Sequence, residues 1–329
     1  MNAERQTKLK GGSLNNTILF ERGKKKFVRK SVSLIENREY GFQRWYSQLK
    51  RIQRYSVLFP DIFPKLLGYR MEGDIASFDI DYIDNSKNGF EFLVENDEEE
   101  HIDKFFQSLV STMNKMHNNQ NYIMKSDDRA IELYLREEVF QRIQDSKNNT
   151  NFNSFLKYKN ITFQGQEVIG LIHRLDDYVA IAKANYKNSK ECFTHGNLTL
   201  ENTVYNKDLN KIYFIDPYEE NIIDSNLAEY SQLLQSSNSL YELYNGGDAI
   251  VNENIVSMKV KVPKGITIFN SKLQKFLDES LSRSEMISVK VLEISQFVRM
   301  LPFKAVVDES KMIFFYCLAS KLLNDLIDS

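Results

Sequence analysis

Hydrophobic and polar residues alternate along much of the first 90 residues, which is the pattern of half-buried β-strands. Four runs show this alternation or a β-rich composition: 16–21 (NTILFE), 26–33 (KFVRKSVS), 66–71 and 76–83 (ASFDIDYI). Between the second and third runs, 36–55 is rich in Gln, Arg, Glu and aromatic residues and predicts one helix, which Pro60 and Pro64 terminate. The pattern therefore predicts a small sheet with one helix packed on it.

The rest of the chain is mostly helical in pattern. Within 98–119, apolar residues such as Ile102, Phe105 and Leu109 recur at the helical period. Further helices are expected over 128–146, 165–187, 226–245, 269–282, 284–301 and 308–328, with an Asn-rich loop at 147–153 and a β-like run at 255–262. Residues 192–216 interrupt the helices and predict a loop followed by a tight hairpin. The expected fold class is α+β, with a strand-rich lobe over 1–84 and a larger helical lobe over 85–329.

Composition limits the class of protein. The chain has 329 residues, of which 42% are hydrophobic and 27% charged, so disorder is excluded as its main state and two lobes are expected. The net charge of −2 provides no overall attraction to nucleic acid, so any phosphate site must be local. Cys192 and Cys317 are far apart and outside any CxxC or Cys/His cluster, which argues against a disulfide framework and a structural zinc site. The N-terminus has no apolar signal segment and 312–323 is too short to cross a bilayer, so we expect a soluble cytoplasmic protein without membrane insertion.

The most informative segment runs from His195 to Asn202 (HGNLTLEN) and continues, after the short hairpin, to Asp216 in the sequence IDP. Phosphoryl transfer from a nucleotide needs oxygen ligands for Mg²⁺, a group that receives the hydroxyl proton, and cations on the phosphates. Asp216 follows Asn202 by 14 residues, and a hairpin between them can bring both side chains to one metal ion. Asn202 and Asp216 are therefore the candidate Mg²⁺ ligands.

The pattern HGNLTLEN…FIDP resembles the HGDxxxxN…ID motif of the aminoglycoside phosphotransferase and choline kinase-like family, relatives of the protein kinases. The resemblance implies a bilobal protein-kinase-like fold and a small-molecule kinase that binds ATP and Mg²⁺ in a cleft. In that family His195 would fix the catalytic loop, and Lys30 in the run FVRK would hold the α- and β-phosphates. The resemblance also implies further nucleotide contacts: Glu39 as the ion-pair partner of Lys30, Gly12, Ser13 and Asn15 in a first hairpin over the phosphates, and Asp81 and Ile83 in a linker that binds adenine.

Two further stretches resemble one branch of that family. Residues 224–243 and 295–303 are similar to segments of a branch encoded in bacterial capsule or surface-polysaccharide loci. This similarity implies an acceptor that is a small hydroxyl compound or a sugar, used in surface-polysaccharide metabolism. The acceptor pocket would then come from the C-terminal helices, where Glu219, Glu220 or Asp224 could meet a cationic or polyhydroxy group.

One position departs from the family pattern. Members of the family have Asp where this chain has Asn197, and that Asp accepts the proton of the acceptor hydroxyl. An amide can form a hydrogen bond with the hydroxyl but cannot take its proton at neutral pH. Three interpretations remain open: an engineered substitution, a natural loss that leaves a nucleotide-binding protein without activity, or a natural variant that uses another base.

Each candidate also has a simpler interpretation. A single histidine such as His195 is more often structural than catalytic, and Lys30 competes with the neighbouring residues Lys24, Lys25, Lys26 and Arg29. Strand alternation places Lys30 on the same face as Val28, opposite Phe27 and Arg29, which favours Lys30 for the cleft. Glu39 competes with Glu36, and the glycine turn is not a Walker loop because no GKS or GKT follows it.

Three alternative functions follow from these limits. The first is a catalytically inactive pseudokinase that binds nucleotide and regulates a partner. The second is an antibiotic-modifying phosphotransferase, which differs only in its acceptor. The third is a nucleic-acid-binding protein that uses the basic helix 38–54, although the acidic balance elsewhere argues against it. The preferred partner is a small-molecule hydroxyl acceptor rather than nucleic acid, and the sequence leaves the oligomeric state open.

Overall fold

The computed structural model describes residues 5–9, 16–23, 25–35, 40–120, 124–125, 129–186, 190–218 and 221–329. The chain divides into two compact units, each assembled from separate stretches of sequence. The first unit contains 1–92, 107–116 and 195–221, and the second contains 93–106, 117–194 and 222–329.

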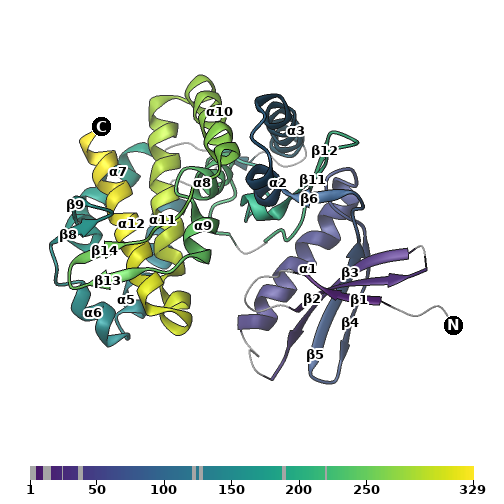
Figure 1. Cartoon of the computed structure of the whole chain (residues 1–329), viewed down its shortest axis with the longest axis horizontal. Coiled ribbons are helices and arrows are strands. Elements are labelled where there is room, and N and C mark those ends of the chain that lie inside the picture. The colour runs from purple at the N-terminus through teal and green to yellow at the C-terminus, as the bar shows by residue number, and fades with distance from the viewer. Residues whose placement is uncertain are drawn as a thin grey trace. The chain divides into compact units, whose positions relative to one another are not determined.

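The first unit contains a five-stranded antiparallel sheet with one helix on it, as the alternation predicts (Figure 1). Its strand order is β1 (Arg5–Lys8), β2 (Asn16–Arg22), β3 (Lys25–Ser33), β5 (Ile75–Asp81), β4 (Leu66–Glu72). Helix α1 (Tyr40–Leu58) packs against β3, β5 and β4. Trp45 of α1 and Phe78 of β5 are both buried and lie 6.2 Å apart between ring centroids. Burial of these aromatic side chains, together with Val32 and Ala76, holds the helix on the sheet.

The first unit also contains the predicted hairpin. Strands β11 (Thr203–Asn206) and β12 (Lys211–Phe214) pair antiparallel, and the short strand β6 (Ser86–Asn88) extends the sheet in the order β12-β11-β6. A 3₁₀ turn (Leu200–Asn202) leads into β11. Residues 107–116 of helix α3 (Glu99–His117) belong to the same unit.

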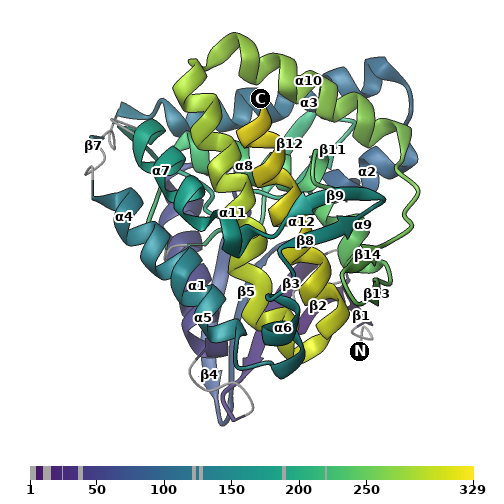
Figure 2. The same cartoon turned by 90° about the vertical axis from the view of Figure 1, so that its left-hand side faces the viewer.

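The second unit is a helical assembly around α11 (Arg283–Val307), which packs against α12 (Glu309–Asp328), α8 (Asn226–Ser237), α7 (Leu175–Asn185) and α5 (Gln141–Ser146) (Figure 2). Val289, Leu292 and Phe297 of α11 are buried, as expected of a helix that is covered on most sides. The remaining helical elements outside the first unit's sheets are α2 (Gly89–Glu95), α4 (Ala130–Tyr134), a π-helical turn (Leu135–Phe140), α6 (Thr150–Phe155), a 3₁₀ turn (Leu171–Arg174), α9 (Tyr241–Gly246) and α10 (Lys264–Ser280). The remaining strands are the pair β7 (Met124–Lys125) and β10 (Lys190–Glu191), and the sheet β13 (Ile250–Asn252), β14 (Ile255–Ser257), β8 (Asn160–Phe163), β9 (Gln166–Ile169).

Four of the predicted elements in the second unit were wrong in part. The helix expected over 165–187 begins only at α7, because β8 and β9 form a hairpin before it. The Asn-rich stretch 147–153 contains the start of α6, whose first turn is capped by the Asn149 side chain accepting from the Phe152 N–H at 2.9 Å. The helix expected over 226–245 divides into α8 and α9 at Leu240, which has a φ of 55°. The β-like run expected over 255–262 is limited to β14.

Within the part of the chain that the structure describes, no helix is long and apolar enough to cross a membrane. Cys192 and Cys317 are free thiols and both are buried.

Candidate active site

The β11–β12 hairpin brings Asn202 and Asp216 to the same end of the sheet. Its register pairs Thr203 with Phe214, so the residues that flank the hairpin lie at its open end. The Ile215 N–H donates to the Asn202 carbonyl at 3.0 Å, which extends the pairing by one step. Asn202 is therefore the hydrogen-bonded neighbour of Ile215, the residue directly before Asp216. This pairing brings Asn202 and Asp216 close together although 14 positions separate them in sequence.

His195 fixes the loop that precedes this hairpin. Its ring is fully buried, lies parallel to Phe63 at 6.1 Å and contacts the edge of Phe214 at 5.6 Å. Nε2 lies 2.7 Å from the Ile215 carbonyl, and Nδ1 accepts from the Asn197 N–H at 3.2 Å. This network assigns the proton of the neutral ring to Nε2. The ring thus connects the loop to the strand end beside Asp216.

Gly196 allows the chain to turn next to His195. Its φ is +83°, in the left-handed region that favours glycine. A Cβ at this position would lie 2.2 Å from Nδ2 of Asn221, 2.3 Å from the Tyr218 carbonyl oxygen and 2.7 Å from Nη1 of Arg51. Both the backbone conformation and the surrounding atoms therefore require glycine at this position.

Asn197 follows directly on the same loop, and its backbone carbonyl accepts from Nδ2 of Asn202 at 2.7 Å and from the Thr199 N–H at 3.0 Å. The Asn197 side chain is half-buried and forms no hydrogen bond with any residue that the structure describes. The backbone of the loop is thus fixed by hydrogen bonds, whereas the Asn197 amide group is left available.

Lys30 reaches this loop from the sheet. It lies on β3 between Val28 and Val32, and all three side chains point to the buried face, as the strand alternation predicts. Lys30 Nζ donates to Oδ1 of Asp216, and the exposed fractions of the two side chains are 6% and 20%. A buried ammonium group needs an opposite charge nearby, and Asp216 provides it.

Asp216 has an unusual backbone conformation, because its φ of 60° lies in the left-handed region. Non-glycine residues adopt this region at a cost of about 1–3 kcal/mol, and such residues cluster at functional sites. Asn85 and Asn210 also have positive φ, so it is the ion pair with Lys30 that distinguishes Asp216 from an ordinary turn residue.

Thr17 is a further candidate for the site that motif spacing does not identify. It lies on β2 directly opposite Lys30 in the strand register. Its side chain is buried, and its hydroxyl oxygen has no hydrogen-bond partner within the described residues. A buried hydroxyl without a partner costs about 1–3 kcal/mol, so an oxygen-rich ligand beside Lys30 would remove a cost that the protein alone leaves. Alternation along 16–21 places Thr17 and Leu19 on one strand face, but the sequence does not fix the register that sets Thr17 opposite Lys30.

Asn202 and Asp216 fit the chemistry of a nucleotide-bound Mg²⁺. Nδ2 of Asn202 donates to the Asn197 carbonyl, which leaves Oδ1 as an available acceptor, and the second carboxylate oxygen of Asp216 has no donor among the described residues. Within the described ranges, no group of three or more His, Cys, Asp and Glu residues could hold a metal ion by itself. Mg²⁺ commonly binds through one or two protein oxygens together with substrate phosphates and water, and this donor pair fits that arrangement.

Asp81 is the last residue of β5 in the first unit, and Ile83 lies two residues after it. The Asp81 N–H is already bonded to the Lys65 carbonyl at 3.0 Å, and the Ile83 carbonyl accepts from the Ser86 hydroxyl at 2.6 Å. The Ile83 N–H has no hydrogen-bond partner among the described residues. The backbone of Ile83 therefore offers a donor to a planar base, whereas the amide of Asp81 does not.

Several of the predicted contacts lie outside the described residues. These are Gly12, Ser13, Asn15 and Glu39 near the phosphates, and Glu219 and Glu220 near the acceptor. Asp224 is described and belongs to the second unit, where its Oδ1 accepts from the Thr194 hydroxyl at 2.6 Å and its carbonyl accepts from the Cys192 N–H at 3.1 Å.

Comparison with known proteins identifies the fold. No protein family model and no curated protein sequence matches the chain. A protein assigned as fructosamine-3-kinase from Haemophilus somnus 129PT aligns with a TM-score of 0.58 at 12% identity, over 97% of this chain and 91% of the other. Aminoglycoside phosphotransferase APH(4)-Ia aligns with a TM-score of 0.59 at 8% identity, over 98% and 94%. A thermostable mutant of that enzyme, in a ternary complex with AMP-PNP and hygromycin B, aligns with a TM-score of 0.57 at 9% identity, over 97% and 93%.

At these identities the likeness concerns the fold alone. The chain has the α+β protein-kinase-like fold that these phosphotransferases share, and the predicted fold class is confirmed.

Proposed function

We propose that this protein is an ATP- and Mg²⁺-dependent phosphotransferase that moves the γ-phosphoryl group to a hydroxyl of a small molecule. The observation that carries the proposal is the meeting of Lys30 with Asp216 at the open end of the hairpin that also holds Asn202. To position a nucleotide phosphate, a protein needs a cation for the phosphate and oxygen ligands for its metal ion. Lys30 on β3 would supply the cation, and Asn202 and Asp216 would supply the oxygen ligands.

The proposed nucleotide contacts come from residues of the first unit. Lys30 and Thr17 would donate to the phosphates, and this contact would satisfy the Thr17 hydroxyl. Asn202 and Asp216 would hold Mg²⁺, which when bound neutralises the charge that develops on the phosphate oxygens. Asp81 and Ile83 would bind the adenine, with the Ile83 N–H as a donor. Gly12, Ser13 and Asn15 would lie over the phosphates, and Glu39 would be the ion-pair partner of Lys30.

Asn197 would face the hydroxyl group of the acceptor. The amide oxygen accepts a hydrogen bond from the hydroxyl and so orients it, but it does not take the proton at neutral pH. Loss of a general base costs about 10²–10⁴-fold in rate, whereas positioning remains. We therefore expect slow turnover in the chain as it stands.

The acceptor we favour is a polyhydroxy compound such as a sugar or an amino alcohol, used in surface-polysaccharide metabolism. The support for this class is that the similar structures include a protein assigned as fructosamine-3-kinase and an enzyme bound to hygromycin B. The assignment to the capsule-locus branch rests on segments 224–243 and 295–303 and stays a prediction.

The direct test is a panel of small hydroxyl compounds with ATP and Mg²⁺, using the Asn197→Asp form. Phosphorus NMR would detect a phosphorylated product and so name the acceptor. The matched control is the double variant Asn197→Asp, Lys30→Met, which should form no product because the phosphates lose their cation. Product formed equally by the control would contradict the assigned site.

A nucleotide-binding pseudokinase is the second candidate, and Asn197 is the observation that favours it. It predicts nucleotide binding without turnover in both the Asn197 and the Asn197→Asp forms. An antibiotic-modifying phosphotransferase is a variant of the main proposal with a different acceptor, and resistance conferred on expression would identify it.

A further inference from the structure

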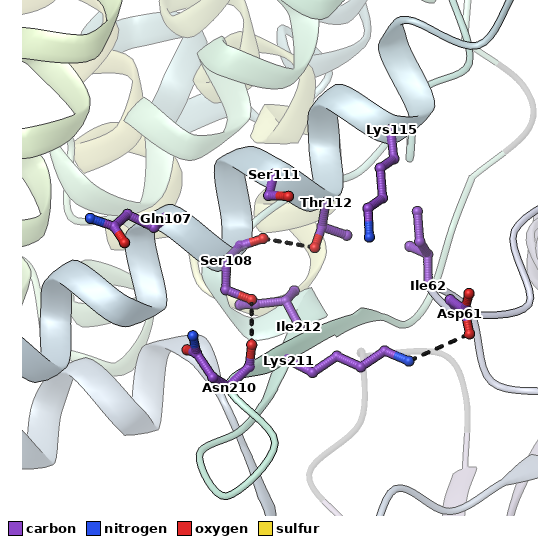
Figure 3. Close-up of a pocket in the computed structure, with 10 residues that line it drawn as sticks. All are labelled: Asp61, Ile62, Gln107, Ser108, Ser111, Thr112, Lys115, Asn210, Lys211 and Ile212. Atoms are coloured by element: carbon purple, nitrogen blue, oxygen red, sulfur yellow. Dashed lines mark hydrogen bonds and ion pairs between the residues drawn. The ribbon is translucent and has the colours of Figure 1, made fainter.

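A polar cavity of about 500 Å³ lies in the first unit (Figure 3). One wall is the polar face of α3, and the opposite wall is the turn of the β11–β12 hairpin together with the segment that follows α1. None of the lining residues is a proposed nucleotide or metal contact. The size lies within the range of about 300–1,000 Å³ that small-molecule sites have.

One hydrogen bond joins the two walls, and further bonds fix the backbone within each wall. The Ser108 hydroxyl of α3 donates to the Asn210 carbonyl at 3.2 Å, and the Thr112 hydroxyl donates to the Ser108 carbonyl at 2.7 Å (Figure 3). On the wall opposite α3, the Phe214 N–H of β12 donates to the Ile62 carbonyl at 2.9 Å, which ties the hairpin to the segment that follows α1. The cavity is therefore a preformed feature of the unit, and a ligand need not assemble it.

The charges around the cavity favour an anion. Lys115 has no acidic partner among the described residues, and its side chain extends from α3 toward the space beside Ile62 (Figure 3). Lys211 lies 3.7 Å from Asp61, but the Asp61 side chain is 86% exposed, so this pair is screened by water and weak. Two ammonium groups and one solvated carboxylate leave a net positive charge at the cavity.

The uncharged lining groups favour a ligand with hydroxyls. Gln107 and Ser111 lie on the same face of α3 as Lys115, four residues apart, and their side chains have no hydrogen-bond partner among the described residues. Ile62 and Ile212 also line the cavity, but both side chains are almost fully buried. We propose that this cavity binds a phosphorylated sugar or polyol, with the phosphate on Lys115 and Lys211 and the hydroxyls on Gln107 and Ser111.

The test is calorimetric titration of the full chain with glucose 6-phosphate, and with glucose and inorganic phosphate as separate probes. We expect saturable binding of glucose 6-phosphate that weakens by about tenfold or more in Lys115→Gln and also weakens in Lys211→Gln, since each variant loses a charge-assisted hydrogen bond to the phosphate. Lys104→Gln is the matched control, because Lys104 is exposed on the same helix and pairs with Glu100 instead. It should bind as the unaltered chain does.

Lys30→Met separates this proposal from the proposed function, because it should retain glucose 6-phosphate binding while losing nucleotide. Absence of saturable binding, or binding lost in Lys30→Met and kept in Lys115→Gln, would overturn the proposal. If glucose bound as tightly as glucose 6-phosphate, the proposed binding of the phosphate by Lys115 and Lys211 would be overturned. If inorganic phosphate bound as tightly as glucose 6-phosphate, the proposed binding of the hydroxyls by Gln107 and Ser111 would be overturned. Unchanged melting temperatures of the lysine variants would show that any loss is local.

Discussion

At the scale of single residues, burial of a charge explains why Lys30 and Asp216 belong together. Lys30 is buried on a strand between two valines and would be costly to fold without an opposite charge. Asp216 supplies that charge although 186 positions separate the two residues. The Thr17 hydroxyl, opposite Lys30 in the strand register, has no hydrogen-bond partner among the described residues. The charge of Lys30 is therefore neutralised, whereas the hydrogen-bonding capacity of Thr17 is not used.

The Asn197→Asp substitution should raise the rate of phosphoryl transfer by about 10²–10⁴-fold, because a carboxylate in place of the amide can accept the hydroxyl proton. The measurement is kcat with the acceptor that the compound panel identifies. Asn153→Asp, on the exposed surface of α6, is the control and should leave kcat unchanged. A rate that does not increase in Asn197→Asp would count against a missing general base at this position.

The Gly196→Ala substitution should lower the free energy of unfolding by at least about 2 kcal/mol, since alanine is strained at positive φ and the added carbon has no room. The neighbouring atoms lie only 2.2 and 2.3 Å from the position of that carbon. Urea unfolding measures the change. Gly68→Ala is the matched control, because nothing lies within 4 Å of the position that its added methyl group would take. Equal effects at both positions would show that the crowding at Gly196 is unimportant.

Cys192 and Cys317 should be unreactive toward a thiol reagent in the folded protein. Burial raises the pKa of both thiols, so little thiolate is present at neutral pH, and neither sulfur is accessible. Both should react rapidly once guanidinium unfolds the chain. Rapid modification of either residue without denaturant would contradict the burial of that thiol.

At the scale of elements, the sequence pattern predicted the parts whose periodicity is local. The strands and helix of the first unit follow from alternation and from the aromatic-rich segment that ends before Pro60. The hairpin β8–β9 was missed because its turn, Gln164 and Gly165, has positive φ at both residues, and because β8 also pairs with the distant strand β14. The division between α8 and α9 was missed for a similar reason, since Asn238 and Ser239 at the break both donate to Glu293 of α11. Contacts between distant segments decide both cases.

The residues of the candidate site also divide into those that local sequence patterns can identify and those that depend on contacts between distant segments. Asn202, Asp216 and Lys30 could be selected from motif spacing and strand alternation, because a short hairpin and a single strand position them. Thr17 could not be selected in this way, since its significance depends on the register between β2 and β3 and on the absence of a local hydrogen-bond partner among the described residues.

The Glu293→Gln substitution should raise the free energy of unfolding at neutral pH. Burial raises the pKa of Glu293 above its ordinary value of 4.5, so the folded state keeps a proton that the unfolded chain releases. The contribution of Glu293 to the free energy of unfolding is therefore lost as the pH rises from 4.5 toward the pKa that Glu293 has in the folded state. Glutamine keeps the oxygen that accepts from Ser239 and Asn238 and carries no charge.

Urea unfolding at acidic and neutral pH measures this effect. The stability of the unaltered chain should fall more between the two pH values than that of the Glu293→Gln variant. Glu279→Gln, on the exposed end of α10, is the control and should behave as the unaltered chain does. Parallel pH profiles for the unaltered chain and its Glu293→Gln variant would contradict a raised pKa at this residue.

At the scale of the whole molecule, the candidate site belongs to one compact unit built from three stretches of sequence. Lys30 comes from 1–92, and Asn202 and Asp216 come from 195–221. A division of the chain at residue 84, as the sequence predicts for the two lobes, separates Lys30 from Asp216. We therefore expect a fragment that ends near residue 84 to lack the ion pair and to bind no nucleotide.

Calorimetric titration with ATP, in the presence and absence of Mg²⁺, shows whether Lys30, Asn202 and Asp216 bind a Mg²⁺-nucleotide. We predict saturable, Mg²⁺-dependent binding that weakens by about tenfold or more in Lys30→Met, because the ammonium forms charge-assisted hydrogen bonds with phosphate. Lys26→Met, whose side chain is exposed and pairs with Asp84, should bind as the unaltered chain does. No binding by the unaltered chain, or equal binding by the Lys30→Met and Lys26→Met variants, would contradict the account.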